Sequence, residues 1–165
     1  MYSPGMSEPL PDPDEYWMAA ALKQAEAAFD LEEVPVGAVV VHQGKIIGRG
    51  HNQTEQLQDP TAHAEILAIG AAATSLGSWR LTDCTLYVTV EPCCMCAGAI
   101  VWSRLSRLVY GAPDPKAGAC GSLYDIVNDK RLNHRVPTTH GVRLEEAAGL
   151  MKAFFQKRRK PEEAS

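Results

Sequence analysis

The feature that most constrains the fold of this chain is a pair of cysteines, Cys93 and Cys96, together with His63 about thirty residues earlier. Two thiolates three positions apart can reach one metal ion from a single helical turn, and His63 is a candidate third ligand. Glu65 follows the histidine closely enough to lie beside any metal that it holds. A structural zinc site has four protein ligands, whereas a catalytic site leaves one position to water. The pattern therefore predicts that two distant segments meet around a zinc ion whose water is the reagent.

Local patterns predict helices and strands along most of the chain. Asp12-Pro13 has the form of an N-cap followed by proline at the first helical position, so we expect a helix to about residue 30. Helical periodicity predicts further helices that begin near His63, at the cysteine pair and near Leu144, the last ending at Pro161. Residues 52–60 are expected to form a polar loop. Runs rich in β-branched residues predict strands over residues 36–42, 45–51, 84–90, 107–110 and 138–142.

This order of elements predicts an α/β fold in which a mixed five-stranded sheet is flanked by helices on both faces. It also places His63 and both cysteines at the beginnings of helices, where free N–H groups and the helix dipole favour the thiolate that binds metal. Residues 1–11, which contain prolines and no apolar periodicity, are expected to be a disordered leader. Residues 12–160 are then a single domain, and residues 161–165 a tail.

The composition limits where such a protein works. A chain of 165 residues can bury a core without disulfide bonds. Of its five cysteines, three stand within four positions, which is a poor disulfide framework and fits a reducing compartment. No segment has the pattern of a signal peptide or a membrane span. We therefore expect a cytoplasmic protein with no membrane partner.

The proposed zinc site would carry out hydrolysis. Zinc can lower the pKa of its bound water from about 15.7 towards about 7. Glu65 is not needed as a ligand, so it is free to take up a proton and to return it elsewhere. This combination suits the hydrolytic replacement of an amino group on an electron-poor ring carbon.

Three other interpretations of the motif remain open at this point. A C-x-x-C pair after a strand also resembles a thioredoxin-type redox pair, although that function leaves His63 and Glu65 unexplained. A closed structural zinc site could take Cys94, Cys84 or Cys120 as its fourth ligand. A zinc-stabilised RNA-binding module without catalysis is the third. Bound-metal stoichiometry and release of ammonia distinguish all three from a deaminase.

The distribution of charge favours a polyanionic partner more than the net charge of −4 suggests. Residues 1–33 hold eight acidic residues against one lysine, whereas residues 97–160 hold twelve Lys/Arg against five Asp/Glu. A basic segment of this kind is typical of nucleic-acid binding, and equally of ordinary solvated helix faces. The bases at 157–160 also suit the C-terminus of a helix.

The motif and its surroundings resemble the zinc-dependent cytidine/deoxycytidylate deaminase superfamily and, within it, the bacterial tRNA-specific adenosine deaminases. The resemblance to the superfamily depends on His63-Ala64-Glu65 and Pro92-Cys93-x-x-Cys96. The resemblance to the tRNA-specific family depends on segments throughout the chain. These segments are Glu15–Met18, Glu33–Ala38, Asp59–Glu65, Glu91–Cys93, Met95–Ala99, Gly111-Ala112 with Asp114 and Lys116, Gly121-Ser122, Asn133–Arg135, and Phe154-Phe155 with Arg158-Arg159.

The resemblance implies a three-layer, cytidine-deaminase-like α-β-α fold and the hydrolytic conversion of adenosine to inosine at the wobble position of a tRNA anticodon. It also implies that His63, Cys93 and Cys96 hold one Zn²⁺ per subunit, that Glu65 transfers protons, and that the protein is a homodimer. The partner would be the anticodon stem-loop of a tRNA. Residues that match substrate-binding positions of the family are Asn52, Asp114, Lys116, Asn133 and Arg158.

A guanine deaminase, or another free-base or nucleoside deaminase of the same superfamily, is the nearest alternative. It shares the blocks at residues 59–65 and 91–99. A free base has no phosphate backbone, however, so it does not account for the Gly111–Lys116 segment or for the basic last helix. These features favour the tRNA-acting branch.

Overall fold

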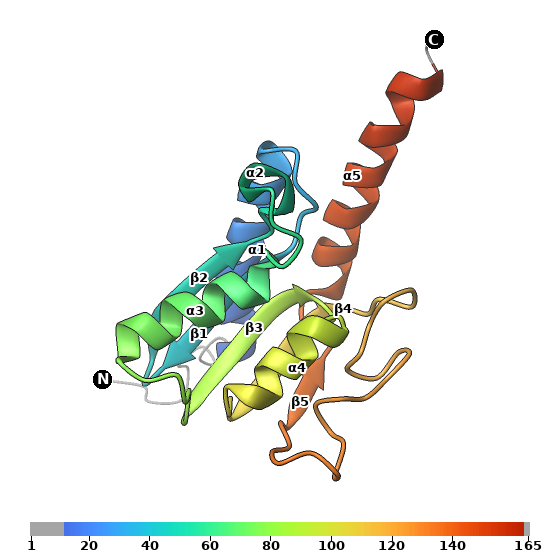
Figure 1. Cartoon of the computed structure of the whole chain (residues 1–165). Coiled ribbons are helices and arrows are strands. Elements are labelled where there is room, and N and C mark those ends of the chain that lie inside the picture. The colour runs from blue at the N-terminus through green and yellow to red at the C-terminus, as the bar shows by residue number, and fades with distance from the viewer. Residues whose placement is uncertain (1–11, 164–165) are drawn as a thin grey trace, which may run out of the picture.

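A mixed five-stranded sheet forms the centre of the structure, a computed structural model that describes residues 12–163, with side chains to residue 159 (Figure 1). The predicted leader and the last two residues lie outside the described residues. The strand order is β2-β1-β3-β4-β5. Strand β1 is antiparallel to both of its neighbours, and β3, β4 and β5 are mutually parallel. The strands are β1 (Gly37–His42), β2 (Lys45–His51), β3 (Cys84–Val90), β4 (Arg107–Ala112) and β5 (Thr138–His140).

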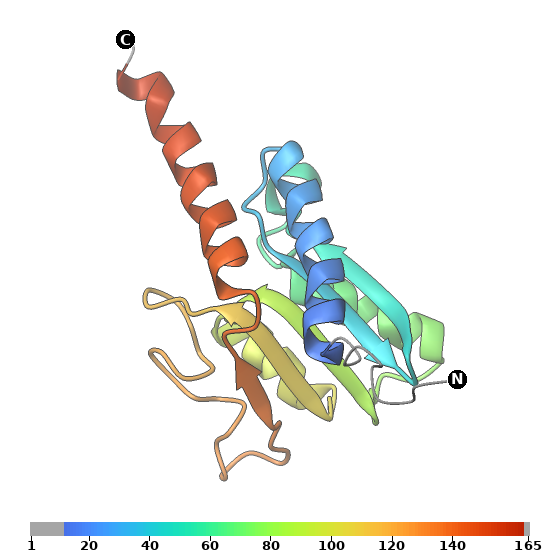
Figure 2. The same ribbon diagram turned by 180° about the vertical axis from the view of Figure 1, so that it is seen from behind.

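Helices cover both faces of this sheet, as the sequence predicts. Helices α3 (Ala64–Leu76) and α4 (Cys94–Trp102) lie on one face, and α1 (Pro13–Asp30) and α5 (Leu144–Glu163) lie on the other (Figures 1 and 2). Side chains alternate between these layers along each strand. In β3, Leu86 and Val88 are buried with α3 and α4, while Tyr87 is buried with α1. The fold is therefore the three-layer α/β arrangement expected from the sequence.

Glycines in β2 let α3 approach the sheet closely. A Cβ atom on Gly50 would lie 2.3 Å from the carbonyl oxygen of Ala64, and one on Gly48 would lie 2.3 Å from that of Ala68. Both distances are far below van der Waals contact, so any larger residue would displace the helix. Because Ala64 is the first residue of α3, this close packing fixes where the helix begins and where His63 stands.

Several element boundaries differ from the sequence predictions. Residues 52–60 are not wholly a loop but contain a short helix, α2 (Thr54–Leu57). Strand β4 continues to Ala112, and β5 ends at His140, because Gly141 with its φ of +83° turns the chain. Helix α5 continues through Pro161 to Glu163, so the proline lies in its final turn, where it removes a single helical hydrogen bond. None of the helices in the described part of the chain is both long and apolar enough to cross a membrane.

An ion pair joins the start of α1 to the parallel half of the sheet. Asp12 caps α1 by accepting a hydrogen bond from the N–H of Asp14, as predicted. Asp14 then receives two hydrogen bonds of 2.7 Å from Arg107 in β4 and one of 3.0 Å from the Tyr87 hydroxyl. The hydrogen bonds from Arg107 lower the pKa of the Asp14 carboxyl despite its partial burial. Arg107 also donates to Thr139 in β5, so one guanidinium connects three elements.

The substitution Asp14→Asn removes the charge of this pair and keeps the size of the side chain. Because the pKa of Asp14 is lowered in the folded state, the pair stabilises the fold above the unfolded pKa of about 3.9, and this stability is lost as the pH falls through the folded pKa. We expect the variant to lose about 1–3 kcal/mol of unfolding free energy at pH 7, measured by urea denaturation. The difference should disappear at strongly acidic pH. Glu26→Gln, an exposed site in the same helix, is the control, and equal stability of Asp14→Asn and wild type at pH 7 would contradict the assignment.

Candidate metal centre and active-site pocket

The side chains of His63, Cys93 and Cys96 meet in space with their ligand atoms within 4.8 Å of one another. His63 Nδ1 lies 3.6 Å from the sulfur of Cys93 and 3.5 Å from that of Cys96. A tetrahedral ion bonded at about 2.1 Å to nitrogen and about 2.3 Å to sulfur would separate these atoms by about 3.6 Å. The three predicted ligands are therefore spaced so that they could hold one metal ion.

Sheet topology explains why two distant segments converge here. Strands β2 and β3 both run antiparallel to β1, so they point in the same direction and their carboxyl ends lie at one edge of the sheet. The chain leaves β2 towards α3 and leaves β3 directly into α4. His63 is the N-cap of α3 and Cys93 is the N-cap of α4, both with extended backbone, and Cys96 lies in the first turn of α4. The two helix beginnings thus face each other at that edge.

The three remaining cysteines stand apart from this cluster. Cys94 is exposed, and Cys84 lies at the start of β3 with its sulfur 3.6 Å from His42. Cys120 is buried, with its sulfur near the carbonyl oxygen of Pro92. In the described part of the chain, the group of His63, Cys93 and Cys96 gains no fourth cysteine ligand, which argues against a closed structural site.

Cys93 and the neighbouring Glu65 both have altered acidity. Hydrogen bonds from Cys96 and from His63 lower the pKa of the Cys93 thiol to about 3, so Cys93 is a thiolate at neutral pH. Glu65 is 4% exposed, and its burial raises the pKa of its carboxyl, a shift that the nearby His63 opposes. Glu65 therefore lies buried beside the two groups His63 and Cys93 that influence its acidity.

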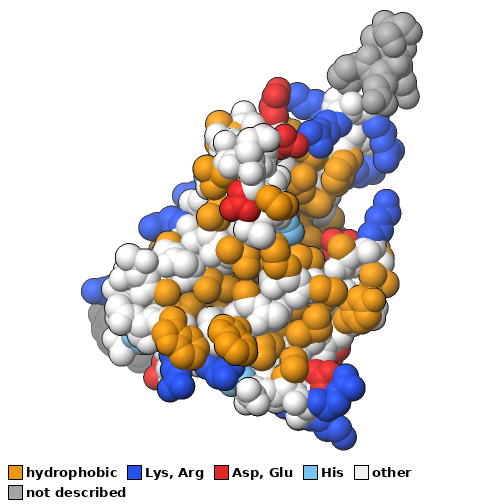
Figure 3. Space-filling model, in the orientation of Figure 1, with side chains coloured by type: hydrophobic (Ala, Val, Ile, Leu, Met, Phe, Trp, Pro, Cys, Tyr) orange, Lys and Arg blue, Asp and Glu red, His pale blue; other side chains and the backbone are white. Residues whose placement is uncertain are grey.

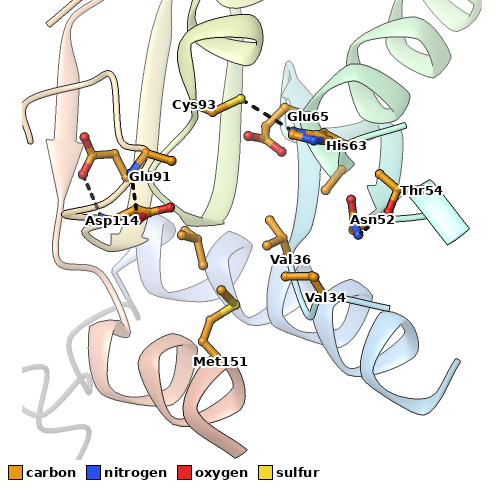
Figure 4. A pocket seen from close by; sticks show the side chains of 13 residues that line it. Val34, Val36, Asn52, Thr54, His63, Glu65, Glu91, Cys93, Asp114 and Met151 are labelled. Carbon is orange, nitrogen blue, oxygen red and sulfur yellow. Dashed lines mark hydrogen bonds between the residues drawn. The ribbon is translucent and has the colours of Figure 1, made fainter. Parts of the chain in front are cut away.

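A cavity of about 270 Å³ opens beside this cluster. Figure 4 shows Glu65 next to the His63 ring, with Asn52 and Thr54 on one side of the pocket and Glu91 and Asp114 on the other. Between these polar groups the lining is apolar. Its apolar side chains come from the segment before β1, from the end of β3 and from α5, and include Val34, Val36, Val90 and Met151. The pocket can therefore take a flat, largely apolar ring whose edges carry polar atoms.

Asn52 is held in place by a buried carboxylate. Its amide nitrogen donates to Glu33 at 3.3 Å, and Asn52 is 6% exposed. Glu33 also accepts the backbone N–H groups of Glu55 at 3.3 Å and of Gln56 at 2.7 Å, at the start of α2. Glu33 thereby stabilises both the short helix that was not predicted and the orientation of Asn52.

The structure brings together only some of the predicted substrate-binding residues. Asn52 and Asp114 line the pocket, whereas Lys116 lines an adjoining cavity of about 400 Å³ beside α5, together with Asp114 and Arg159. Arg158 lines a cavity of about 420 Å³ between the end of α1 and α5. Asn133 is exposed in the loop before β5 and lines neither cavity. The basic residues thus lie around the pocket rather than inside it.

Sequence reasoning assigned no role to Glu33, Glu91 or Met151. Glu33 and Glu91 are buried acids that lie in segments resembling the deaminase family. Glu33 directly precedes Val34, and Glu91 directly follows Val90. Sequence reasoning could have found both acids, because each lies beside a strand that is expected to be buried. Met151 lines the pocket because α5 packs across the end of the sheet. Local sequence patterns do not indicate where α5 packs.

Comparisons with known proteins show which families this chain resembles. The model of the MafB19-like deaminase family matches residues 13–159. A tRNA-specific adenosine deaminase of Bacillus subtilis (strain 168) is 48% identical over 152 residues, covering 92% of this chain and 94% of that protein. The tRNA-specific adenosine deaminase of Aquifex aeolicus (strain VF5) is 47% identical over 145 residues, covering 88% and 95%.

Solved structures give the same result. A structure from a study of A-to-I editing by tRNA:A34 deaminases superimposes with a TM-score of 0.79 at 44% identity, covering 82% of this chain and 98% of that chain. A guanine deaminase from Nitrosomonas europaea superimposes with a TM-score of 0.76 at 25% identity, covering 91% and 88%. The relatives at higher identity are therefore those that act on tRNA.

We expect the purified protein to bind one divalent cation per chain, measured by titration with Co²⁺ and by its thiolate-to-metal absorption. Cys93→Ser and Cys96→Ser should each weaken binding strongly, because a hydroxyl is a poor substitute for a thiolate ligand. Cys94→Ser is the matched control, since Cys94 is adjacent in sequence and exposed. Loss of metal in the Cys94→Ser variant would contradict this ligand set.

Proposed function

Because the chain belongs to the MafB19-like deaminase family and, within it, to the tRNA-specific adenosine deaminases, we propose that it converts adenosine to inosine at the wobble position of a tRNA anticodon. The observation that carries this proposal is the cluster of three ligand side chains with Glu65 buried beside it, at one end of a pocket that suits a single base. The overall reaction replaces the amino group at C6 with oxygen from water and releases ammonia.

We propose that the metal is Zn²⁺, one per subunit, held by His63, Cys93 and Cys96. One nitrogen and two sulfur donors at tetrahedral spacing form a ligand set that zinc prefers. When bound, zinc supplies an activated water for attack on the ring carbon.

Glu65 is the residue that transfers protons. Its burial raises the pKa of the carboxyl above its ordinary value, which strengthens it as a proton acceptor. Glu65 accepts one proton from the attacking water and delivers it to ring nitrogen N1. It then accepts a second proton from the hydroxyl group now on C6 and passes it to the amino group, which leaves as ammonia. The carboxyl thus ends the cycle as it began.

The pocket receives a base that has left its stack, because C6 of a stacked adenine cannot reach the cluster. Val34, Val36, Val90 and Met151 form apolar surfaces against the faces of the ring. Asn52 faces an edge of the base, and Glu33 fixes the orientation of its amide. An amide can pair with the donor and acceptor atoms of adenine.

The RNA backbone follows the basic residues around the pocket. Helix α5 separates two cavities, one lined by Lys157 and Arg158 and the other by Lys116 and Arg159. The guanidinium of Arg158 lies 5.1 Å from the centre of the Phe154 ring, which helps to hold it at the surface. Asp114 and Asn133 contribute polar contacts from the loops before β5. A free purine has no phosphate groups that could bind to this basic surface.

We further propose that the protein acts as a homodimer in the cytoplasm. Apolar side chains gather over the outward side of α3 and α4 (Figure 3). Trp102, at the end of α4, is 69% exposed, and Met95 and Trp79 are also exposed. An apolar surface of this kind supports coverage by a second copy of the chain.

Substrate identity is tested by incubating the protein separately with tRNA, guanine and cytosine, and by measuring inosine, xanthine and uracil. We expect inosine from tRNA alone. Glu65→Ala should keep its metal and lose at least about 10²-fold in rate, since it removes the proton carrier but no ligand. Glu26→Ala is the control. Xanthine as the main product would favour the guanine deaminase alternative, and loss of metal in Glu65→Ala would make Glu65 a ligand or a structural residue.

The basic surface is tested by reversing two charges, in the double variant Arg158→Glu/Arg159→Glu. We expect weaker binding of tRNA and a shallower dependence of affinity on salt, because each lost phosphate contact removes about 0.7–0.9 from the logarithmic slope. Lys23→Glu, exposed on α1, is the matched control. If both the affinity and the slope of the double variant equal those of wild type, α5 lies outside the RNA footprint.

A further inference from the structure

Glu91 is a buried acid that occupies the wall of the pocket opposite Asn52. It is 3% exposed and directly follows β3, where its N–H donates to the carbonyl oxygen of Ala112 at 2.8 Å. Its carboxylate turns away from the ligand cluster towards the loop of residues 112–122 (Figure 4). Among the described residues, no lysine or arginine forms an ion pair with it.

Donors from that loop satisfy the carboxylate instead. The backbone N–H groups of Asp114, Cys120 and Ser122 each donate to it at 3.0 Å, and the Ser122 hydroxyl donates as well. These hydrogen bonds lower the pKa of the Glu91 carboxyl against the opposing effect of its burial. One anion thus gathers donors from three positions that are spread over the whole loop.

Gly118 shows how closely the loop wraps around this anion. A Cβ atom at residue 118 would lie 2.3 Å from Cδ of Glu91 and 2.5 Å from the carbonyl oxygen of Asp114. The backbone of Gly118 therefore occupies space that no side chain could share with the carboxylate. Gly118 also donates its N–H to Asp114 at 2.8 Å, which closes the turn.

The hydrogen bonds of Glu91 also affect the residues that line the pocket, because one of its donors is Asp114. The Asp114 carboxylate accepts the N–H groups of Lys116 at 3.0 Å and of Ala117 at 3.2 Å. Asp114 and Ala117 line the pocket, and Lys116 lines the adjoining cavity. A continuous chain of hydrogen bonds therefore runs from Glu91 through Asp114 to Lys116.

We infer that Glu91 is a positioning residue, which holds the loop of residues 112–122 so that Asp114, Lys116 and Ala117 form the RNA-binding wall of the pocket. Glu91 acts through these residues and not on the reacting atoms. The inference rests on the proposed function, because it assigns the loop to the RNA substrate.

Steady-state kinetics on an anticodon stem-loop RNA test this role. Glu91→Gln has the same shape but carries an amide, which cannot accept all of the loop donors. We expect KM to rise at least about 10-fold while kcat stays within about 3-fold and the bound metal stays at the wild-type level. A fall in kcat at unchanged KM would place Glu91 at the chemical step, and unchanged KM and kcat would remove any role, so either result overturns the inference.

Gly118→Ala tests the same contact without altering Glu91. The added methyl group must displace the loop from the carboxylate, so we expect KM to rise as in Glu91→Gln. Gly149→Ala, at a helical position with no atom within 4 Å of the new Cβ, is the matched control. A wild-type KM in Gly118→Ala overturns the inference even if Glu91→Gln does not fold.

A double-mutant cycle separates positioning from general destabilisation. If Glu91 acts through Asp114, the double variant Glu91→Gln/Asp114→Ala should bind RNA about as weakly as Asp114→Ala alone. Fully additive effects on KM contradict that route. Wild-type protein that forms no inosine would overturn the proposed function, whereas active wild type with an unchanged KM in Glu91→Gln would overturn only the present inference.

Discussion

The site depends on one topological constraint, namely that β2 and β3 point in the same direction because both are antiparallel to the strand between them. Their carboxyl ends therefore share an edge, and the helices that follow them begin side by side. His63 and Cys93 occupy the N-cap positions of these helices, so the backbone alone brings together the side chains that could hold a metal ion. Close packing of α3 on the glycines of β2 fixes this meeting point.

Sequence reasoning succeeded where the cause was local or periodic. The grouping of His63, Cys93 and Cys96 follows from residue type and spacing. The N-cap at Asp12 and the strand at residues 84–90 follow from short-range rules. The same rules predicted the order of strands and helices, and with it the three-layer fold. The antiparallel pairing of β1 with β3, which brings the carboxyl ends of β2 and β3 to one edge, comes from the structure and was not predicted.

It failed where stability comes from residues distant in sequence. Helix α2 has four residues and could not form alone, and its first N–H groups are held by Glu33, more than twenty positions earlier. The place of Met151 in the pocket likewise depends on how α5 crosses the end of the sheet. Helical spacing places Met151 on the inward side of the last helix, but a single sequence does not show which distant residues such a side chain, or a buried acid, will contact.

Two buried acids in one pocket show how the surroundings of a side chain decide its role. Burial raises the pKa of Glu65, which shares its space with an imidazole and two sulfurs. Glu91 is buried as well, yet hydrogen bonds from the loop of residues 112–122 lower its pKa, so it remains an anion. Carboxyl groups whose pKa values are driven apart by their surroundings are suited to different roles. In the roles proposed for them, Glu65 exchanges a proton and has its pKa raised by burial, whereas Glu91 keeps the charge that anchors the loop of residues 112–122.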